Sequence, residues 1–254
     1  NAAARDLYQD VTDRIVAALE QGVAPWAPSH TAAPLTLPRN GATGRPYSGL
    51  NVVLLWIAGQ GYASAEWYTF NQARALGACV RRGERGTAVT FWREIPRRNA
   101  EAGDEEETPA RRVPLLRRFV VFNRAQIDGL PDAPATETPR TAWERIEAAE
   151  ALVQGTGARV TEAAARPCYL PATDTVHMPA RGAYADPEGF YADLLHELAH
   201  WTGHPSRLAR PMCGAFGSAD YAREELVAEL ASAFTCAALG ITGKLTHAEY
   251  LGAW

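Results

Sequence analysis

A stretch of structure-breaking residues near the middle of the chain limits what this sequence can fold into. Residues 128–141, "DGLPDAPATETPRT", are rich in Pro and Thr and show no apolar periodicity. Segments of this composition connect domains and do not pack into cores. A chain of 254 residues is long enough for two ordinary domains. The sequence therefore predicts a first domain over residues 1–130, a linker over residues 131–140 and a second domain over residues 141–254.

The two predicted domains differ in charge. The whole chain carries −4 at pH 7, with 47 % apolar and 21 % charged residues, as in ordinary globular proteins. Residues 1–130 hold 16 Arg and 13 Asp or Glu, a net charge of +3, which leaves −7 for residues 131–254. This asymmetry indicates that the two halves have different partners.

The cysteines and the apolar runs exclude two classes of protein. Cys79, Cys168, Cys213 and Cys236 are widely spaced and form no CxxC pair, which is typical of reduced thiols rather than of a disulfide framework. The sequence contains no apolar run close to the roughly 18 residues that a membrane-spanning helix needs. We therefore expect a cytoplasmic protein with no membrane partner.

Apolar periodicity predicts an α+β first domain with a small antiparallel sheet. Three apolar helical patterns precede two strand patterns, and a charged, breaker-rich loop separates the strands. Ser48 and Thr69 stand where N-caps are expected for the second and third helices. The expected helices cover residues 5–22, 48–61 and 69–77, and the expected strands cover residues 87–95 and 115–123.

The second half predicts helices around short strands. A helix over residues 141–157 precedes strands over 158–163 and 168–179, the latter interrupted by a turn near Asp174. Two more helical patterns follow. They cover residues 186–203, beginning near Asp186 and Pro187, and residues 218–240, capped by Ser218 or Asp220.

The first of these two helices carries a metal-binding pattern, "DLLHELAHWTGH", residues 193–204. Histidines four apart lie on one helical face, where His196 and His200 can share one metal ion. Glu197, beside the first histidine, can then act as the general base that takes a proton from a water molecule activated by the metal. A bare HExxH pattern also occurs by chance in structural helices. The predicted helix with apolar flanks favours the metal site.

A catalytic zinc ion takes three protein ligands, so a third must come from elsewhere. "REELVAELAS" offers Glu225 and Glu229 on one face, in an order that resembles the E-x-x-A-D of glutamate-type zincins. That resemblance implies Glu225 as ligand and Glu229 as the residue that orients a histidine, with the reverse assignment left open. Glu224 points about 100° away and is expected in solvent. His204 is a rival ligand expected to stabilise a turn, and His177 is expected to be structural.

Basic and aromatic residues alternate in the first half, as they do in proteins that bind single-stranded nucleic acid. Composition alone is weak evidence, because strand aromatics usually lie in cores and turn arginines usually face solvent. "RRGERG" is a basic turn whose glycines allow close approach to phosphates. The residues expected to bind DNA are Arg45, Tyr47, Trp67, Tyr68, Arg81, Arg82, Arg85 and Trp92.

Several segments together resemble the ArdC-type antirestriction proteins of conjugative plasmids, whose N-terminal domain also occurs in conjugative DNA primases. The segments that carry the resemblance are "GRPYSGLNVVLLW", "WYTFNQARALGACVRRGERGTAVTFW", "FVVFNRAQIDGLP", "HELAHWTGHPSRLAR" and "YAREELVAELASAF". The resemblance implies a single-stranded DNA binding domain followed by a zincin-like metallopeptidase domain. It also implies protection of incoming plasmid DNA from host restriction.

The main hypothesis is an antirestriction protein that binds single-stranded DNA and hydrolyses peptides with one divalent metal ion. Zn²⁺ is the expected ion and Mn²⁺ the alternative, and a host protein bound to DNA is the candidate substrate. The rival hypothesis is a coating protein that shields single-stranded DNA and whose metal site is structural or inactive. A metal-dependent nuclease is less favoured, because HExxH helices are typical of amide hydrolysis.

Overall fold

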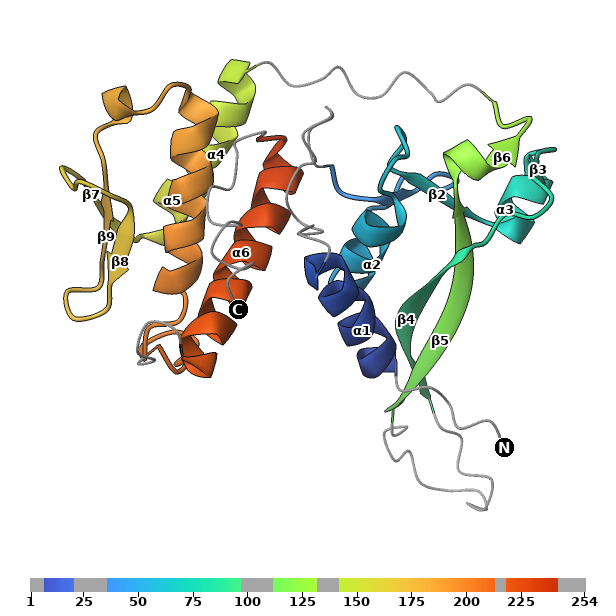
Figure 1. The fold of residues 1–254 in the computed structure, drawn as a ribbon, viewed down its shortest axis with the longest axis horizontal. Coiled ribbons are helices and arrows are strands. Elements are labelled where there is room, and N and C mark those ends of the chain that lie inside the picture. Colours follow the sequence, from blue (N-terminus) through green and yellow to red (C-terminus); the bar gives the residue numbers. More distant parts are fainter. Residues whose placement is uncertain (1–6, 21–35, 97–111, 132–141, 213–217, 242–254) are drawn as a thin grey trace, which may run out of the picture. The chain divides into compact units, whose positions relative to one another are not determined.

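The computed structural model describes residues 7–20, 36–96, 112–131, 142–212 and 218–241. The chain divides into two compact units, residues 38–132 and residues 133–254 together with 1–37. Figure 1 labels the helices and strands of both units. Helix α1 (Leu7–Glu20) is therefore grouped with the second unit, whereas the sequence placed residues 1–37 in the first domain. Residues 132–140 of the expected linker lie outside the described residues.

The first unit is built on a mixed four-stranded sheet with the order β1-β2-β5-β4. The expected strands form the antiparallel hairpin of β4 (Thr87–Pro96) and β5 (Arg112–Asn123), and β2 (Glu66–Thr69) adds antiparallel to β5. The short β1 (Arg39–Asn40) runs parallel to β2, so the expected antiparallel sheet is in fact mixed. A second ladder pairs β3 (Cys79–Val80) with β6 (Ile127–Asp128), which follows the 3-10 helix η1 (Arg124–Gln126).

Helix α2 (Leu50–Ala58) packs against β4 and protects that edge strand. The Asn51 side chain donates to the backbone oxygen of Thr90 at 2.7 Å and accepts from the Thr90 N–H at 2.9 Å, which satisfies backbone groups that β5 cannot reach. The expected Ser48 cap is wrong, because the helix starts after Gly49, whose φ is 56°, with no side-chain cap bond. Thr69 does cap α3 (Phe70–Ala75), in a capping box with Gln72.

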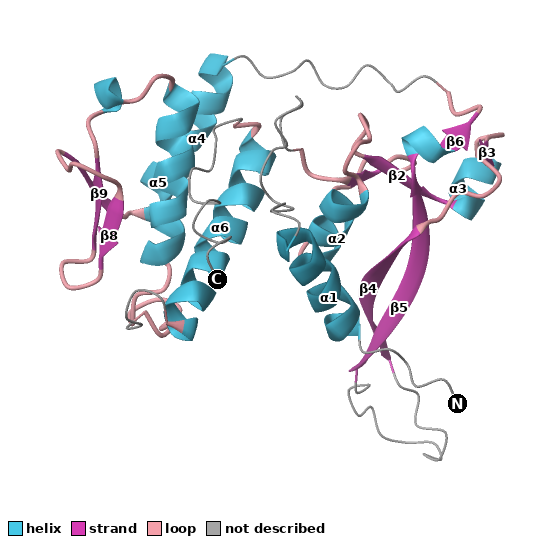
Figure 2. Cartoon of the chain, in the orientation of Figure 1, coloured by secondary structure: helices cyan, strands magenta, loops and turns pink. Residues whose placement is uncertain are grey.

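The second unit places helices beside a three-stranded sheet of order β7-β9-β8 (Figure 2). Strand β9 runs parallel to β7 and antiparallel to β8, and Asp174 makes the expected turn between β8 and β9 with φ 49°. The elements are α4 (Ala142–Thr156), β7 (Arg159–Glu162), β8 (Cys168–Leu170), β9 (Thr175–Met178), the 3-10 helix η2 (Arg181–Ala183), α5 (Pro187–Trp201) and α6 (Ala219–Leu239).

The packing of α5 against α6 and the sheet positions the site. Asp186 caps α5 by accepting from the Gly189 N–H at 2.8 Å, and Ser218 caps α6 by accepting from Tyr221 at 3.2 Å. Small buried residues line the contact of the two helices, and the Ser232 hydroxyl donates across it to the Ala192 carbonyl at 3.2 Å. Small side chains let helix axes approach closely, so groups on α5 and α6 can meet. Within the described residues, we find no helix with the length and apolar character to cross a bilayer.

Candidate metal centre

The two histidines of the HExxH pattern meet on α5. The Nε2 atoms of His196 and His200 lie 3.1 Å apart, and their ring centroids lie 4.8 Å apart. Their side chains are 3 % and 12 % exposed, respectively. The spacing of four residues thus places two imidazole nitrogens that could bind a metal ion in one buried location.

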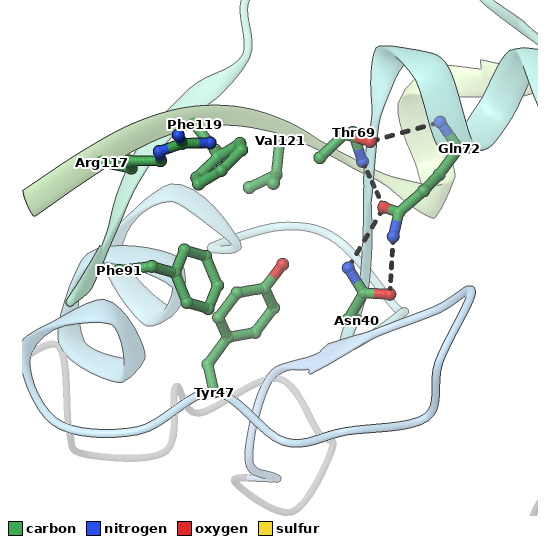
Figure 3. A pocket seen from close by; sticks show the side chains of 8 residues that line it. All are labelled: Asn40, Tyr47, Thr69, Gln72, Phe91, Arg117, Phe119 and Val121. Atoms are coloured by element: carbon green, nitrogen blue, oxygen red, sulfur yellow. Dashed lines mark hydrogen bonds between the residues drawn. The ribbon is translucent and has the colours of Figure 1, made fainter. Parts of the chain in front are cut away.

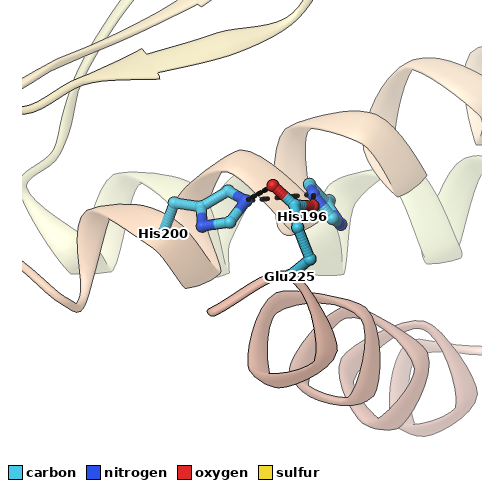
Figure 4. Close-up of side chains that lie close together, drawn as sticks. All are labelled: His196, His200 and Glu225. Atoms are coloured by element: carbon cyan, nitrogen blue, oxygen red, sulfur yellow. Dashed lines mark hydrogen bonds and ion pairs between the residues drawn. The ribbon is translucent and has the colours of Figure 1, made fainter. Parts of the chain in front are cut away.

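Glu225 reaches the same location from α6 (Figure 4). Its Oε2 lies 3.5 Å from Nε2 of His196, and its Oε1 lies 3.7 Å from Nε2 of His200. A tetrahedral ion with bonds of about 2.0–2.1 Å holds its ligand atoms about 3.3 Å apart. The triangle of two nitrogens and a carboxylate therefore fits a divalent ion. In the described part of the chain, these three residues form the group of possible metal ligands.

Glu229 lies one turn after Glu225, on the other side of His196. Its Oε1 is 3.8 Å from Nδ1 of His196, and the carboxylate is fully buried without a hydrogen-bond partner among the described residues. Burial, together with the charge of Glu225, raises the pKa of Glu229 to about 7. Glu225 faces both Nε2 atoms and Glu229 faces Nδ1, an arrangement that favours Glu225 as ligand and Glu229 as the group that orients His196.

The expectation that Glu224 is solvated is wrong. Glu224 is 8 % exposed, and its Oε1 lies 3.2 Å from Nδ1 of His200. The turn of about 100° that separates it from Glu225 directs it toward the end of α5 rather than toward water. Its carboxylate also accepts two hydrogen bonds from Arg210, at 2.8 and 2.7 Å. These contacts overcome the effect of burial, which alone would raise the pKa of Glu224, and hold that pKa below its usual value.

Arg210 is a residue that sequence reasoning missed. Besides Glu224, its guanidinium donates to the Ala199 carbonyl at 2.7 Å and to the Thr202 hydroxyl at 2.8 Å. It therefore ties the last turn of α5 to α6 directly behind His200. Arg210 lies in the loop after α5, where helical spacing carries no information, so the sequence gives no signal for this role.

Glu197 is buried beside the ligands, with 6 % of its surface exposed. Burial raises its pKa to about 7, although the charge of His200 and a backbone hydrogen bond from Tyr169 act in the opposite direction. Burial alone would lower the pKa of His200, but contacts with Glu224 and Glu225 raise it to about 9. A carboxylate whose pKa lies near neutrality is suited to accepting and releasing a proton at neutral pH.

Two further histidines lie in the described residues, His177 and His204, and neither joins this group. His204 is exposed to an intermediate degree, and its Nδ1 contacts the Ser206 hydroxyl at 2.8 Å and accepts from the Ser206 N–H at 3.2 Å. It stabilises the turn after α5, as expected. Nδ1 of His177 contacts the Thr161 hydroxyl at 2.9 Å, which supports its structural role, whereas its buried Nε2 has no hydrogen-bond partner in the described residues.

The residues expected to bind DNA separate into an exposed set and a buried set. Arg45, Arg82 and Arg85 are exposed. Arg81 is also exposed, but it forms ion pairs with Glu84 at 3.0 Å and Asp128 at 3.4 Å.

Two of the expected aromatic contacts require correction. Trp67 and Tyr68 are only 2 % and 3 % exposed, so their rings are part of the core and cannot stack on a base. Tyr47 is 6 % exposed and lines a surface pocket. The side chain of Trp92 lies outside the described residues.

Both halves of the chain match known families. Residues 5–122 match the N-terminal domain of anti-restriction factor ArdC. Residues 147–254 match the zincin-like metallopeptidase family. The second match contains the ligand group and Glu197.

Similar proteins cover almost the whole chain. The uncharacterized protein y4eC of Sinorhizobium fredii is 40 % identical over 260 residues, which span 98 % of this chain and 83 % of that protein. A DNA primase TraC of Escherichia coli is 39 % identical over 267 residues, which span 98 % of this chain but only 18 % of the primase.

Two crystal structures of the antirestriction ArdC protein from the R388 plasmid are also similar. The metal-free structure matches with 38 % identity and a TM-score of 0.74, and the Mn(II)-bound structure with 37 % identity and a TM-score of 0.72. Each match covers 98 % of this chain and 87 % of the crystallised chain. The chain therefore belongs to the ArdC family of antirestriction proteins, with an ArdC N-terminal domain followed by a zincin-like metallopeptidase domain.

Proposed function

We propose that this protein protects incoming plasmid DNA during conjugation by binding single-stranded DNA and by hydrolysing peptide bonds at the metal centre. The observation that carries the peptidase assignment is the triangle of His196, His200 and Glu225, with Glu197 on the same helix as the two histidines. The donor set of two imidazoles and one carboxylate is typical of a catalytic zinc site. Zn²⁺ is the proposed ion, and the Mn(II)-bound relative supports Mn²⁺ as the alternative.

The residues divide the work of amide hydrolysis among them. A divalent ion held by His196, His200 and Glu225 would polarise the peptide carbonyl and make a water molecule more acidic. Glu197 takes the proton from the attacking water and passes it to the leaving amine. Glu224 contacts Nδ1 of His200 at 3.2 Å and orients that imidazole. Glu229 lies 3.8 Å from Nδ1 of His196, where its charge favours a proton on Nδ1 and leaves Nε2 to face the ion. The proposed substrate is a host protein bound to DNA, and the DNA-binding unit would keep the peptidase near it.

Binding to single-stranded DNA is proposed for the first domain, residues 1–130. The relative that is a DNA primase and the match to the ArdC N-terminal domain support it. Arg45, Arg82 and Arg85 are exposed, as phosphate contacts must be. We place the protein in the cytoplasm, because its cysteines are typical of reduced thiols and Cys79, Cys168 and Cys236 are free.

The test is Glu197→Gln beside Glu147→Gln, a matched substitution at an exposed position of α4. Peptide cleavage, metal content, affinity for single-stranded DNA and protection from restriction are measured for both. Glu197→Gln is expected to lower peptide turnover by roughly 10²–10⁴-fold with metal and DNA binding unchanged, because it removes only the general base. Glu147→Gln is expected to behave like the original protein. Undiminished cleavage by Glu197→Gln contradicts the mechanism.

The rival coating function makes the opposite prediction for protection. A protein that only shields DNA loses nothing when Glu197 is replaced, provided that its affinity for DNA is unchanged. Full protection by Glu197→Gln, combined with lost cleavage, therefore favours coating as the antirestriction activity and assigns the peptidase to a separate step of DNA transfer.

A further inference from the structure

The first unit contains a surface pocket of about 310 Å³ that none of the functions above uses (Figure 3). It lies between the segment that leads into α2, the start of α3 and one face of the β4–β5 hairpin. Its volume is at the low end of the roughly 300–1,000 Å³ of small-molecule sites, so it fits a single planar ring system rather than a helix or a strand. The lining residues are Asn40, Tyr47, Thr69, Gln72, Phe91, Arg117, Phe119 and Val121.

Three aromatic rings form one side of this pocket. Phe91 lies 5.5 Å from Phe119 and 6.1 Å from Tyr47, measured between ring centroids. Phe91 is 44 % exposed and Phe119 is 39 % exposed, although neighbouring Val89 and Val121 are buried. Adjacent aromatic side chains that stay exposed beside an open pocket are typical of a binding surface. They offer faces on which a planar ligand can stack.

The strand register places a cation on the same face. Phe91 pairs with Arg117 across the hairpin, and Val89 pairs with Phe119. Directly paired residues lie on one face of a sheet, so the exposed guanidinium of Arg117 is beside the aromatic rings. None of the eight lining side chains is acidic. The pocket therefore combines aromatic faces with a positive charge, which suits a ligand that carries both a ring and a phosphate.

A pair of side-chain amides forms the polar side of the pocket. Asn40 and Gln72 donate to each other at 3.1 and 3.2 Å. The N–H groups of Ala42, Thr43 and Thr69 also bond to these amides and hold them in position. Because these contacts occupy both amide oxygens, the pair offers an incoming ligand an N–H donor, the second amide hydrogen of Gln72, and the carbonyl oxygens on a nucleobase edge can accept from it. This polar edge distinguishes the pocket from a plain apolar hollow.

We propose that this pocket takes one unstacked nucleobase of a single DNA strand. The base stacks on the face of Phe119 and meets Phe91, whose ring stands at 81° to that of Phe119, edge to face. Its polar edge faces Asn40 and Gln72, and Arg117 contacts an adjoining phosphate. This inference rests on the proposed binding of single-stranded DNA and adds a site to it. It predicts a preference for single strands, because bases in a duplex are paired and stacked and cannot enter a pocket without being extruded.

The experiment uses the full chain and two oligonucleotides with equal numbers of phosphates, one of deoxythymidylate and one whose sugars carry no base. For the original protein, we expect the base-carrying strand to bind more tightly. Phe119→Ala should weaken binding of that strand by roughly 5- to 150-fold and leave the abasic strand almost unaffected. Phe119→Tyr should retain the preference, since it keeps the ring. Val120→Ala is the matched control, because Val120 is 49 % exposed and faces away from the pocket.

A cross-linking measurement locates the base directly. A strand with one 5-iodouracil is irradiated on the protein, and the modified peptide is identified by mass spectrometry. Attachment to Phe91, Phe119 or Tyr47 supports the pocket. Cross-links that map only elsewhere, or an unchanged base preference in Phe119→Ala, overturn it while the binding of single-stranded DNA stands. If the original protein binds neither strand, the proposed DNA-binding function itself fails.

Discussion

The candidate metal centre needs buried, paired charges, whereas the proposed DNA-binding surface needs exposed arginines that no acidic side chain compensates. At the metal centre, buried acidic and basic groups contact one another in succession, from Arg210 through Glu224 to His200 and Glu225. In the first unit, Arg39 and Arg124 form ion pairs with the buried Glu66 at 2.9 and 3.1 Å, so Glu66 already compensates their charges. A count of basic residues therefore overestimates the charge that is free to contact phosphates.

The aromatic residues show the same difference. The sequence pointed to Trp67 and Tyr68, which are buried, whereas the rings that reach the surface near a pocket are Phe91 and Phe119. The proposed metal ligands were predicted from the spacing of His196 and His200 along one helix and, for Glu225, from a resemblance to zincins, whereas the proposed surface depends on which side of a strand each residue occupies. Four predictions test this contrast, beginning with the largest expected effect.

Trp67→Ala tests whether Trp67 is a core residue or a DNA contact. Removing a buried Trp leaves a cavity and costs about 3–5 kcal/mol. We expect hydrogen exchange to accelerate strongly in peptides from residues 38–132, with DNA affinity nearly unchanged wherever the variant is still folded. Tyr62→Ala, at a ring that is 36 % exposed and lies 6.4 Å from Trp67, should cost much less. Lost DNA affinity with undisturbed exchange would reverse the assignment.

Glu225→Gln and Glu229→Gln test which carboxylate binds the metal. Replacing a residue that only contacts a metal ligand typically lowers metal affinity by roughly 10- to 100-fold. Replacing a ligand itself should lower metal affinity by more than that. We expect that larger loss for Glu225→Gln and a loss within the smaller range for Glu229→Gln. Calorimetric titration with Zn²⁺ and with Mn²⁺ measures both. The reverse order of the two variants would make Glu229 the ligand.

Arg210→Met tests the support behind His200. Removing the guanidinium leaves Glu224 buried with an uncompensated charge and frees the last turn of α5. We expect metal affinity to fall by roughly 10- to 100-fold in the same titration. Arg223→Met is the control, because Arg223 is 69 % exposed and pairs only with the exposed Asp220 within the described contacts. Equal effects of the two substitutions would remove Arg210 from the site.

Arg82→Ala and Arg81→Ala test the basic turn by salt dependence. Each phosphate contact on single-stranded DNA contributes about 0.7 to the slope of log affinity against log salt concentration. Arg82→Ala should reduce the slope by about that amount if Arg82 contacts one phosphate. Arg81→Ala should reduce it less, because Glu84 and Asp128 already compensate its charge. A slope that neither substitution alters would place the phosphate contacts elsewhere.

Local patterns predicted much of the fold and the centre of the site. The N-caps at Thr69, Asp186 and Ser218 bond to residues three positions later in the chain, so the starts of these helices could be predicted from local sequence. The start of α2 was the exception, because its N-cap is Gly49 and not the expected Ser48. The pairing of β1 with β2 joins residues far apart in sequence and escaped prediction.

The parts of the site that depend on distant residues were also missed. Glu224 is held by hydrogen bonds from Arg210, which lies in a loop. Helical periodicity in the sequence cannot predict a contact to a loop residue. The pocket likewise depends on the register of β4 with β5, which pairs Phe91 with Arg117. Spacing along one element thus predicts which of its side chains lie together, whereas contacts between elements require the fold.

The central claim is that His196, His200 and Glu225 hold one divalent ion. The most direct test is elemental analysis of the protein, purified without a polyhistidine tag, beside His196→Ala combined with His200→Ala. The account predicts a single equivalent of Zn²⁺ or Mn²⁺ in the original protein and none in the double variant, with the fold of both confirmed by circular dichroism. Equal metal content in the two proteins, or no uptake by the original protein even after loading with either ion, would contradict it.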